Sequence, residues 1–240
     1  MWNVGSRRKP VVSARENSTL VQAEHAELSV ISSAVDLLPP PDDFLLDLFI
    51  CAAQKARSID LAWIEERCVN PDQGKYVQQW PGEHYKLLSA LVQCTNAKKV
   101  IEVGTHIGLG ALALLSPGVS VTTYDIVPWG DFPDTALRSE DFNNGLEQRI
   151  GDLSDRKYFK SQRETLAEAD ILFIDGPKDG IFEPKLAEYL VSEFAGSGMF
   201  VMWDDIRVMT MVDAWRRIPV AKLDATSIGH WSGTGFMHFT

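Results

Sequence analysis

The sequence predicts an α/β protein built on a doubly wound, mostly parallel sheet. From about residue 80 onward, short apolar runs alternate with stretches of helical periodicity, an order typical of β-α-β units. The runs are apolar at nearly every position, as expected of strands that helices cover on both faces. Several runs end in a glycine or an acidic residue, which would place ligand-binding groups at one edge of the sheet.

Length and charge limit the class of protein. The chain has 240 residues, of which 45% are hydrophobic, and a formal net charge of −10. This length suits one α/β domain with a full core. An acidic protein is repelled by a phosphate backbone unless it carries a basic stripe. The basic cluster of Arg7, Arg8 and Lys9 lies at the N-terminus, where we interpret it as a solvated tail, so we expect no nucleic-acid partner.

The cysteines and the hydropathy indicate a compartment. Cys51, Cys68 and Cys94 are odd in number, widely spaced and set in apolar helical patterns, so we expect three buried, reduced thiols rather than a disulfide framework or a zinc site. No segment approaches the ~18 consecutive apolar residues of a membrane span, and no apolar segment follows the basic N-terminus as in a secretory signal. A cytoplasmic protein without a membrane partner is the expectation.

Three regions are predicted along the chain: a flexible arm and linker over 1–41, a helical extension or cap over 42–79, and a main α/β domain over 80–240. The arm is polar and ends in three consecutive prolines, which stiffen a linker. The extension carries apolar residues at helical spacing. Its helices could cover a ligand site or form the face of a homodimer, and the pattern does not decide between them.

The elements follow from periodicity and from helix breakers. In the extension, Asp42 is placed to cap a first helix, and a second helix spans Leu61 to about Cys68, with a break at Asn70, Pro71 and Gly74. In the main domain, helical periodicity predicts helices over 82–94, 111–115, 182–194 and 208–218. The strands are expected at Lys99–Val103, Ser120–Tyr124, Leu146–Ile150, Ala169–Ile174, Gly198–Trp203 and Thr234–Phe239.

A glycine-rich turn joins the first strand of the main domain to a helix. It reads Gly104-Thr105-His106-Ile107-Gly108-Leu109-Gly110, and such a turn lets a ligand approach the backbone and the positive end of the helix. The spacing is GxxxGxG, not the GxGxxG of dinucleotide-binding proteins. Glu102 precedes the turn, and its carboxylate could accept from an ammonium group or orient the loop through water. A turn needed only for packing is the alternative.

Two further acids follow the next strands of the predicted sheet. Asp125 ends the second strand, where a carboxylate can accept from two ribose hydroxyls. Asp152 follows the third strand and could accept from an adenine amino group. Its alternative role is to cap the next helix.

The motifs IEVGTHIGLG, TYDI and IGDLSD resemble the cofactor-binding series of class I S-adenosylmethionine (SAM)-dependent methyltransferases. The resemblance implies a Rossmann-like SAM methyltransferase fold, with 80–240 as the catalytic domain. It also implies that Glu102, Gly104 and Gly108 line the methionine end of SAM, together with Thr105 and Gly110 of the same turn. On the same resemblance, Asp125 binds the ribose and Asp152 meets the adenine.

A second acidic group is expected where two other strands end. Asp175 follows one strand, and Asp204 and Asp205 follow another. Since the carboxyl ends of parallel strands converge, the three carboxylates should lie close together and repel one another. A divalent cation would remove that repulsion, and all-oxygen ligands suit Mg²⁺, Mn²⁺ or Ca²⁺.

The segments FIDGPKD and WDDI resemble the metal-dependent O-methyltransferases of the catechol and caffeoyl-CoA type. This resemblance, which covers roughly residues 80–206, implies metal ligands at Asp175, Asp204 and Asp205 and a general base at Lys178. A metal ion that binds the substrate oxygens would lower their pKa and fix their position, and a lysine beside a cation has a lowered pKa. His230 is a candidate second base or substrate contact.

Structural alternatives stand beside these roles. Asp205 could cap a helix that begins at Ile206, and Asp175 could simply form a turn. Lys178 could be a surface lysine paired with Asp179 or Glu183. His230 could be a purely structural histidine.

The leading hypothesis is a metal-assisted O-methyltransferase that acts on a small molecule with two adjacent oxygens. A metal-independent O- or N-methyltransferase is the first alternative. A nicotinamide-dependent oxidoreductase is disfavoured by the GxxxGxG spacing, and a non-catalytic SAM-binding protein is a fourth hypothesis.

Overall fold

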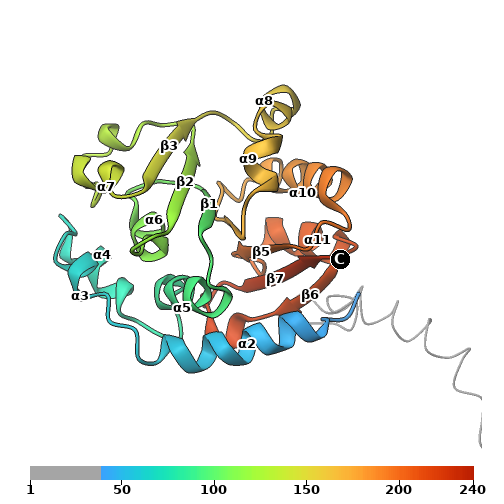
Figure 1. Ribbon diagram of the computed structural model, residues 1–240, viewed down its shortest axis with the longest axis horizontal. Coiled ribbons are helices and arrows are strands. Elements are labelled where there is room, and N and C mark those ends of the chain that lie inside the picture. Colours follow the sequence, from blue (N-terminus) through green and yellow to red (C-terminus); the bar gives the residue numbers. More distant parts are fainter. Residues whose placement is uncertain (1–38) are drawn as a thin grey trace, which may run out of the picture. The chain divides into compact units, whose positions relative to one another are not determined.

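The structure, a computed structural model, describes residues 39–240 and contains one sheet in that range (Figure 1). Its seven strands lie in the order β3-β2-β1-β4-β5-β7-β6. All neighbouring pairs are parallel except those of β7, which is antiparallel to both β5 and β6. The predicted doubly wound sheet is therefore confirmed. The strands are β1 Lys99–Val103, β2 Ser120–Asp125, β3 Leu146–Ile150, β4 Ile171–Ile174, β5 Met199–Asp204, β6 Ala221–Asp224 and β7 Thr234–Phe239.

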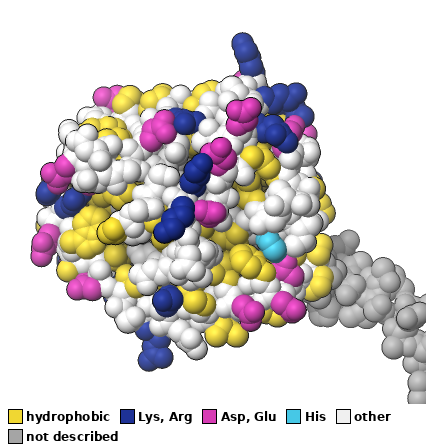
Figure 2. Space-filling model, in the orientation of Figure 1, with side chains coloured by type: hydrophobic (Ala, Val, Ile, Leu, Met, Phe, Trp, Pro, Cys, Tyr) yellow, Lys and Arg dark blue, Asp and Glu magenta, His cyan; other side chains and the backbone are white. Residues whose placement is uncertain are grey.

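The expected tail at Arg7–Lys9 and nearly all of the 1–41 arm lie outside the described residues. Within them, Figure 2 shows acidic and basic side chains interspersed on the viewed face, without a basic stripe.

The helices are α2 Asp43–Ala56, α3 Ala62–Glu65, α4 Pro71–Val77, α5 Tyr85–Thr95, α6 Leu109–Leu114, α7 Ser139–Asn143, α8 Arg156–Ser161, α9 Arg163–Ala167, α10 Phe182–Phe194 and α11 Met209–Arg217. Two short 3-10 helices, Trp129–Asp131 and Thr226–Ile228, complete the described elements.

Helices cover both faces of the sheet, and each face has its own core. Successive side chains of a strand point to opposite faces. In β4, Ile171 and Phe173 join the core beneath α2, α5 and α6, whereas Leu172 and Ile174 join the core beneath α8, α10 and α11. This double coverage explains why β4 is apolar at every position.

The extension over 42–79 differs in part from its prediction. Asp42 caps α2 as expected, since its Oδ1 accepts from the Leu45 backbone N–H at 2.9 Å. The second helix is shorter than expected, and α4 begins at Pro71, where a break was predicted. Proline suits the first position of a helix because its missing N–H would have no partner there, and the Asn70 side chain caps the same turn. Whether 42–79 is a separate cap stays a prediction.

The strand β6 was not predicted. Its sequence, AKLD, alternates apolar and charged residues over only four positions. Lys222 is nonetheless buried, and its Nζ donates to the Trp215 carbonyl oxygen at 2.7 Å, at the end of α11. A lysine that binds the last carbonyls of a helix is stabilised by the helix dipole, but the sequence alone does not reveal this pairing.

The expectation of three reduced thiols is wrong for two cysteines. Cys51 of α2 and Cys94 of α5 form a disulfide, while Cys68 is free. The two helices pack side by side, which brings together cysteines that are 43 positions apart. The disulfide removes the argument from cysteine usage for a reducing compartment. In the described part of the chain, no helix is both long and apolar enough to cross a membrane.

The disulfide should stabilise the fold. Replacing both Cys51 and Cys94 by serine is expected to lower the free energy of unfolding by roughly 3–4 kcal/mol, because the cross-link restricts the unfolded chain. Urea denaturation measures this change. Cys68→Ser is the control, and its effect should be far smaller. An unchanged free energy of unfolding in the double variant would show that the cross-link contributes no stability.

Candidate active site

A cleft of about 730 Å³ lies at the carboxyl ends of β1, β2 and β4. One part of its wall contains Asp125 and Asp152, and another contains Gly104, Asp175 and Lys178. The acids predicted to bind the ribose and the adenine therefore line the same cleft as the predicted metal ligand Asp175 and the predicted base Lys178. Glu102 does not line this cleft but borders a smaller cavity of about 140 Å³, which shares Gly104 and Asp175 with it.

The glycine-rich loop lies against the end of β4. Gly104 has φ +104°, and a Cβ built on it would lie 2.0 Å from the Asp175 carbonyl oxygen. Only glycine allows both this backbone conformation and this close approach. Gly108, with φ +86°, occupies the N-cap position of α6. The loop thus joins β1 to α6 and forms part of the wall of the cleft.

Glu102 helps to hold the glycine-rich loop in place. Thr123 Oγ1 donates to Glu102 Oε2 at 2.6 Å, and Thr123 shares a second hydrogen bond of 2.8 Å with Thr105. A Cβ on Gly110 would lie 2.2 Å from Glu102 Oε1, so the carboxyl group occupies the space beside α6. Burial raises the pKa of Glu102 well above its ordinary value. These contacts favour a role in orienting the loop over direct contact with an ammonium group.

Asp125 and Asp152 shape the turns that follow β2 and β3 in the wall of the cleft. Asp125 accepts from the backbone N–H groups of His106 and Val127 at 2.9 and 3.0 Å. Asp152 is exposed and accepts from the Ser154 backbone N–H at 2.7 Å. The suggestion that Asp152 caps the next helix is wrong, because Asp155 caps α8.

The structure brings Asp175, Asp204 and Asp205 together, as predicted. One carboxylate oxygen from each lies within 4.8 Å of the others. Lys178 Nζ forms an ion pair with Asp175 and lies 3.0 Å from Asp205 Oδ2. Burial opposes the charged lysine, but the carboxylates of Asp175, Asp204 and Asp205 hold the pKa of Lys178 above its ordinary value. Lys178 therefore serves as their counter-ion in this arrangement.

The helix-cap and surface-lysine alternatives are wrong. The helix α11 begins at Met209, so Asp205 does not cap it. The side chain of Lys178 pairs with neither Asp179 nor Glu183, although its backbone N–H donates to Glu183 Oε1 at 2.7 Å. Lys178 and Asp205 have φ +54° and +61°, a conformation that costs a non-glycine residue about 1–3 kcal/mol. Such strain is typical of functional sites.

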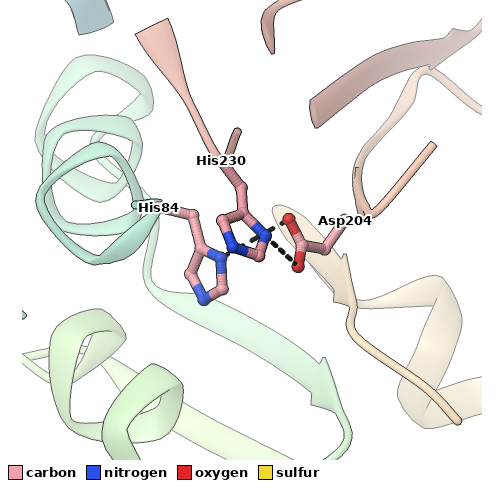
Figure 3. Close-up of side chains that lie close together, drawn as sticks. All are labelled: His84, Asp204 and His230. Carbon is pink, nitrogen blue, oxygen red and sulfur yellow. Dashed lines mark hydrogen bonds and ion pairs between the residues drawn. The ribbon is translucent and has the colours of Figure 1, made fainter. Parts of the chain in front are cut away.

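Two histidines complete the cluster (Figure 3). His230 was singled out from the sequence, and its Nδ1 lies 3.0 Å from Asp204 Oδ2 and 2.8 Å from Ser232 Oγ. His84 was not singled out from the sequence, because it follows no predicted strand and lies inside an expected helix. Its Nδ1 is 3.4 Å from Asp204 Oδ1. Asp204 is only 1% exposed, and its carboxylate faces both imidazole rings from one side.

The charges of the two histidines and of Asp204 and Asp205 shift one another's pKa values. Burial opposes charge on His230, but hydrogen bonds to Asp204 and Asp205 raise its pKa to about 10. Burial likewise opposes charge on Asp204, yet His84 and His230 hold the pKa of Asp204 below its ordinary value. With these partners His230 is a cation at neutral pH and donates hydrogen bonds. Its proposed role as a base would require a change in this environment.

Comparisons with known proteins place the fold. No protein-family model and no curated protein matches the chain. A solved structure of a candidate caffeoyl-CoA O-methyltransferase from Staphylococcus aureus matches with a TM-score of 0.52 and 16% identity, covering 82% of this chain and 98% of that one. An O-methyltransferase from Bacillus cereus in complex with S-adenosylhomocysteine (SAH) matches with a TM-score of 0.46 and 20% identity, covering 92% and 99%.

The Staphylococcus structure establishes the class of fold. Together with the sheet order and the reversed strand β7, it shows that this chain has the Rossmann-like fold of class I methyltransferases. At 16% identity the likeness shows the fold alone, and the activity is argued from the site itself.

Proposed function

We propose that the protein is a SAM-dependent methyltransferase that transfers a methyl group to an oxygen of a small molecule. The observation that carries the proposal is the single cleft that contains Asp125, Asp152, Gly104, Asp175 and Lys178. In one region of this cleft, carboxylates are available to the hydroxyl and amino groups of a nucleoside. Next to that region lies a partly buried cluster of charged groups, which suits catalysis.

The cofactor roles follow from position in the cleft. Asp125 would accept from the ribose hydroxyls, and Asp152 would accept from the adenine amino group. Gly104 and Gly108 would allow the methionine end to approach the backbone. Glu102, Thr105 and Gly110 would hold the loop in place beneath it.

The acidic cluster fits a divalent cation. Asp204 Oδ1 is buried and has no hydrogen-bond partner among the described residues, and one carboxylate oxygen each of Asp175, Asp204 and Asp205 lies within 4.8 Å of the others. Mg²⁺, Mn²⁺ or Ca²⁺ would suit these oxygen donors. When bound, such an ion would lower the pKa of two adjacent substrate oxygens and fix their position.

The chain's own residues would carry the proton. As the substrate oxygen attacks the methyl carbon, the new C–O bond forms and the S–C bond of SAM breaks, which leaves SAH. The hydroxyl proton would pass to Lys178 Nζ. That role requires the uncharged amine, which is favoured when a bound cation, rather than the lysine, neutralises Asp175 and Asp205. His230 would donate a hydrogen bond to the substrate.

A second candidate is metal-independent methyl transfer. The observation in its favour is the position of Lys178, which already neutralises two of the three carboxylates. Methyl transfer that continues in EDTA would support this candidate over the metal-dependent one.

A cytoplasmic location and a homodimer stay proposals. The Cys51–Cys94 disulfide weighs against the first, because the cytoplasm is usually a reducing compartment. The second rests on the helices of 42–79, whose apolar residues Leu46 and Ile50 are exposed. Light scattering that gives the mass of one chain at high concentration would exclude the dimer.

Asp125→Ala should weaken cofactor binding. The substitution removes the proposed ribose contact, the hydrogen bond from His106 of the glycine-rich loop and the one from Val127, so SAH affinity should fall about 10- to 100-fold. Calorimetric titration measures it. Asp155→Ala is the matched control, because it removes a helix cap next to the cleft and should lower stability by about 1 kcal/mol without changing SAH affinity. Equal SAH affinity of Asp125→Ala and the wild type would exclude the ribose role.

The proposal as a whole is tested by titrating Mg²⁺ and Mn²⁺ into protein saturated with SAH. We expect SAH to bind and one ion per chain to follow, with ion binding lost in Asp204→Ala. Methyl transfer to a panel of catechols and vicinal diols should then depend on that ion. A chain that does not bind SAH is not a SAM-dependent methyltransferase. A chain that binds SAH but no ion would leave the metal-independent candidate.

A further inference from the structure

A second group of potential metal ligands lies beside the acidic cluster. His84, Asp204 and His230 each present one donor atom, and these atoms lie within 4.8 Å of one another (Figure 3). At the centre, His84 Nδ1 and Asp204 Oδ1 are buried and lie 3.4 Å apart, yet neither has a hydrogen-bond partner among the described residues. A buried polar atom without a hydrogen-bond partner destabilises the folded state, so the pair needs an explanation.

Asp204 differs from Asp175 and Asp205 in the groups that pair with its carboxylate. Lys178 forms ion pairs with both Asp175 and Asp205, and the Ser232 hydroxyl donates to Asp205. Neither contact reaches Asp204. Its carboxylate instead faces the two imidazole rings, and His230 Nδ1 also lies 3.3 Å from Asp205 Oδ1. A metal ion bound here would therefore take the place of the proton that His230 shares with these carboxylates.

We propose that His84, His230 and Asp204 form a two-histidine, one-carboxylate site for a divalent transition-metal ion of the first row. The inference rests on the proposed function, because the ion would be the one that holds the acceptor oxygens. It changes the donors from three carboxylates to two imidazole nitrogens and one carboxylate, and it makes His230 a metal ligand in place of a hydrogen-bond donor to the substrate. The preferred ions change with them, from Mg²⁺ and Ca²⁺ to ions such as Mn²⁺, Fe²⁺, Co²⁺ or Zn²⁺.

The distances suit such an ion. With metal–ligand bonds of about 2.1 Å, adjacent donors around an octahedral ion lie about 3.0 Å apart. The His230 Nδ1–Asp204 Oδ2 distance is 3.0 Å, and the His84 Nδ1–Asp204 Oδ1 distance is 3.4 Å. The two distances reach different oxygens of Asp204, so the ion would bind both carboxylate oxygens, or the His84 ring would shift toward the oxygen that faces His230.

The backbone holds the two histidines together although they are far apart in sequence. Gly82 forms a β-bridge to His230, in which the Gly82 N–H donates to the Gly229 carbonyl and the Trp231 N–H donates to the Gly82 carbonyl, each at 3.0 Å. Next to this bridge, Glu83 Oε2 lies 3.6 Å from His230 Nε2. A carboxylate beside the second nitrogen of a ligating histidine orients the ring and strengthens it as a ligand.

The site opens toward the proposed methyl donor. His84 lines the smaller cavity together with Gly104 and Asp175, and these two residues also line the cofactor cleft. The protein supplies three ligands, so further coordination positions would be left for substrate oxygens on this side.

The donors can be identified by electron spin-echo spectroscopy of Mn²⁺ bound to the full chain in the presence of SAH. Histidine nitrogens give a characteristic modulation, and growth with ¹⁵N-histidine changes its frequency, which separates histidine from Lys178. The variants are His84→Asn and His230→Asn, with His238→Asn, a histidine remote from the cluster, as the control. SAH affinity and the melting temperature of each variant show whether it is folded.

We expect histidine-nitrogen modulation in the wild type and in His238→Asn, and its reduction or loss in the two site variants. One bound Mn²⁺ without histidine modulation would overturn the inference and leave the carboxylate site of the proposed function. A chain that binds SAH but no Mn²⁺ would overturn both metal sites. Failure to bind SAH would overturn the proposed function, while the Mn²⁺ spectrum would still decide the donors.

Discussion

Replacing Lys178 by methionine is expected to abolish methyl transfer and, at the same time, to tighten the binding of a divalent cation. As the proton acceptor, Lys178 should contribute about 10²- to 10⁴-fold to the rate. As a cation between Asp175 and Asp205, it also competes for these carboxylates with a metal ion that binds the three acids of the proposed function. Methionine keeps much of the side-chain volume but removes the charge, so Mn²⁺ affinity should rise by roughly tenfold or more.

The two effects are measured separately, by methyl transfer from labelled SAM and by calorimetric titration of Mn²⁺. Lys99→Met is the matched control, because Lys99 is also paired with a carboxylate, that of Glu168, but on the exposed surface. It should change neither quantity. Normal methyl transfer by Lys178→Met would remove the lysine from the mechanism, and unchanged or weaker Mn²⁺ affinity would show that the lysine and the ion do not compete.

Gly104→Ala should destroy the cofactor cleft. The new Cβ would meet the Asp175 carbonyl oxygen at 2.0 Å, and the alanine would have to keep φ +104°. Because the obstacle is backbone, relief requires the loop or the end of β4 to move. We expect a loss of about 3 kcal/mol or more in the free energy of unfolding and at least ~100-fold weaker SAH binding.

Gly118→Ala isolates the conformational part of this effect. Gly118 has φ +80° in an exposed turn, and a Cβ there would meet nothing within 4 Å. Its substitution should cost only about 1–2 kcal/mol of stability and leave SAH affinity unchanged. If both variants lose equal stability and both still bind SAH, the close approach of Gly104 to Asp175 is not what shapes the cleft.

Much of the fold was predictable because its signals are local. The continuous apolar run of β4 and the helical spacing of α10 report burial on both faces of one sheet. The acids at strand ends were predictable for a related reason. Parallel strands place their carboxyl ends at one edge, so Asp125, Asp175 and Asp204 could be brought together without knowing any side-chain contact.

The features that sequence reasoning missed depend on pairings between distant segments. Cys51 and Cys94 each look like an ordinary apolar position of a helix, and only the packing of α2 on α5 joins them. His84 is similar, because the bridge between Gly82 and His230 carries it to Asp204. The error at Pro71 was of another kind, since proline both ends and begins helices and the capping Asn70 was the deciding signal.

The bridge between Gly82 and His230 also has a consequence for biosynthesis. The groups that line the cofactor cleft lie between Val103 and Lys185, whereas His230 and Ser232 come from the segment just before the last strand. A chain that emerges from the ribosome in order holds every residue of the cleft well before it holds His230 and Ser232. The cluster around Asp204 is therefore completed only when the segment before β7 reaches Gly82, after the rest of the sheet has been synthesised.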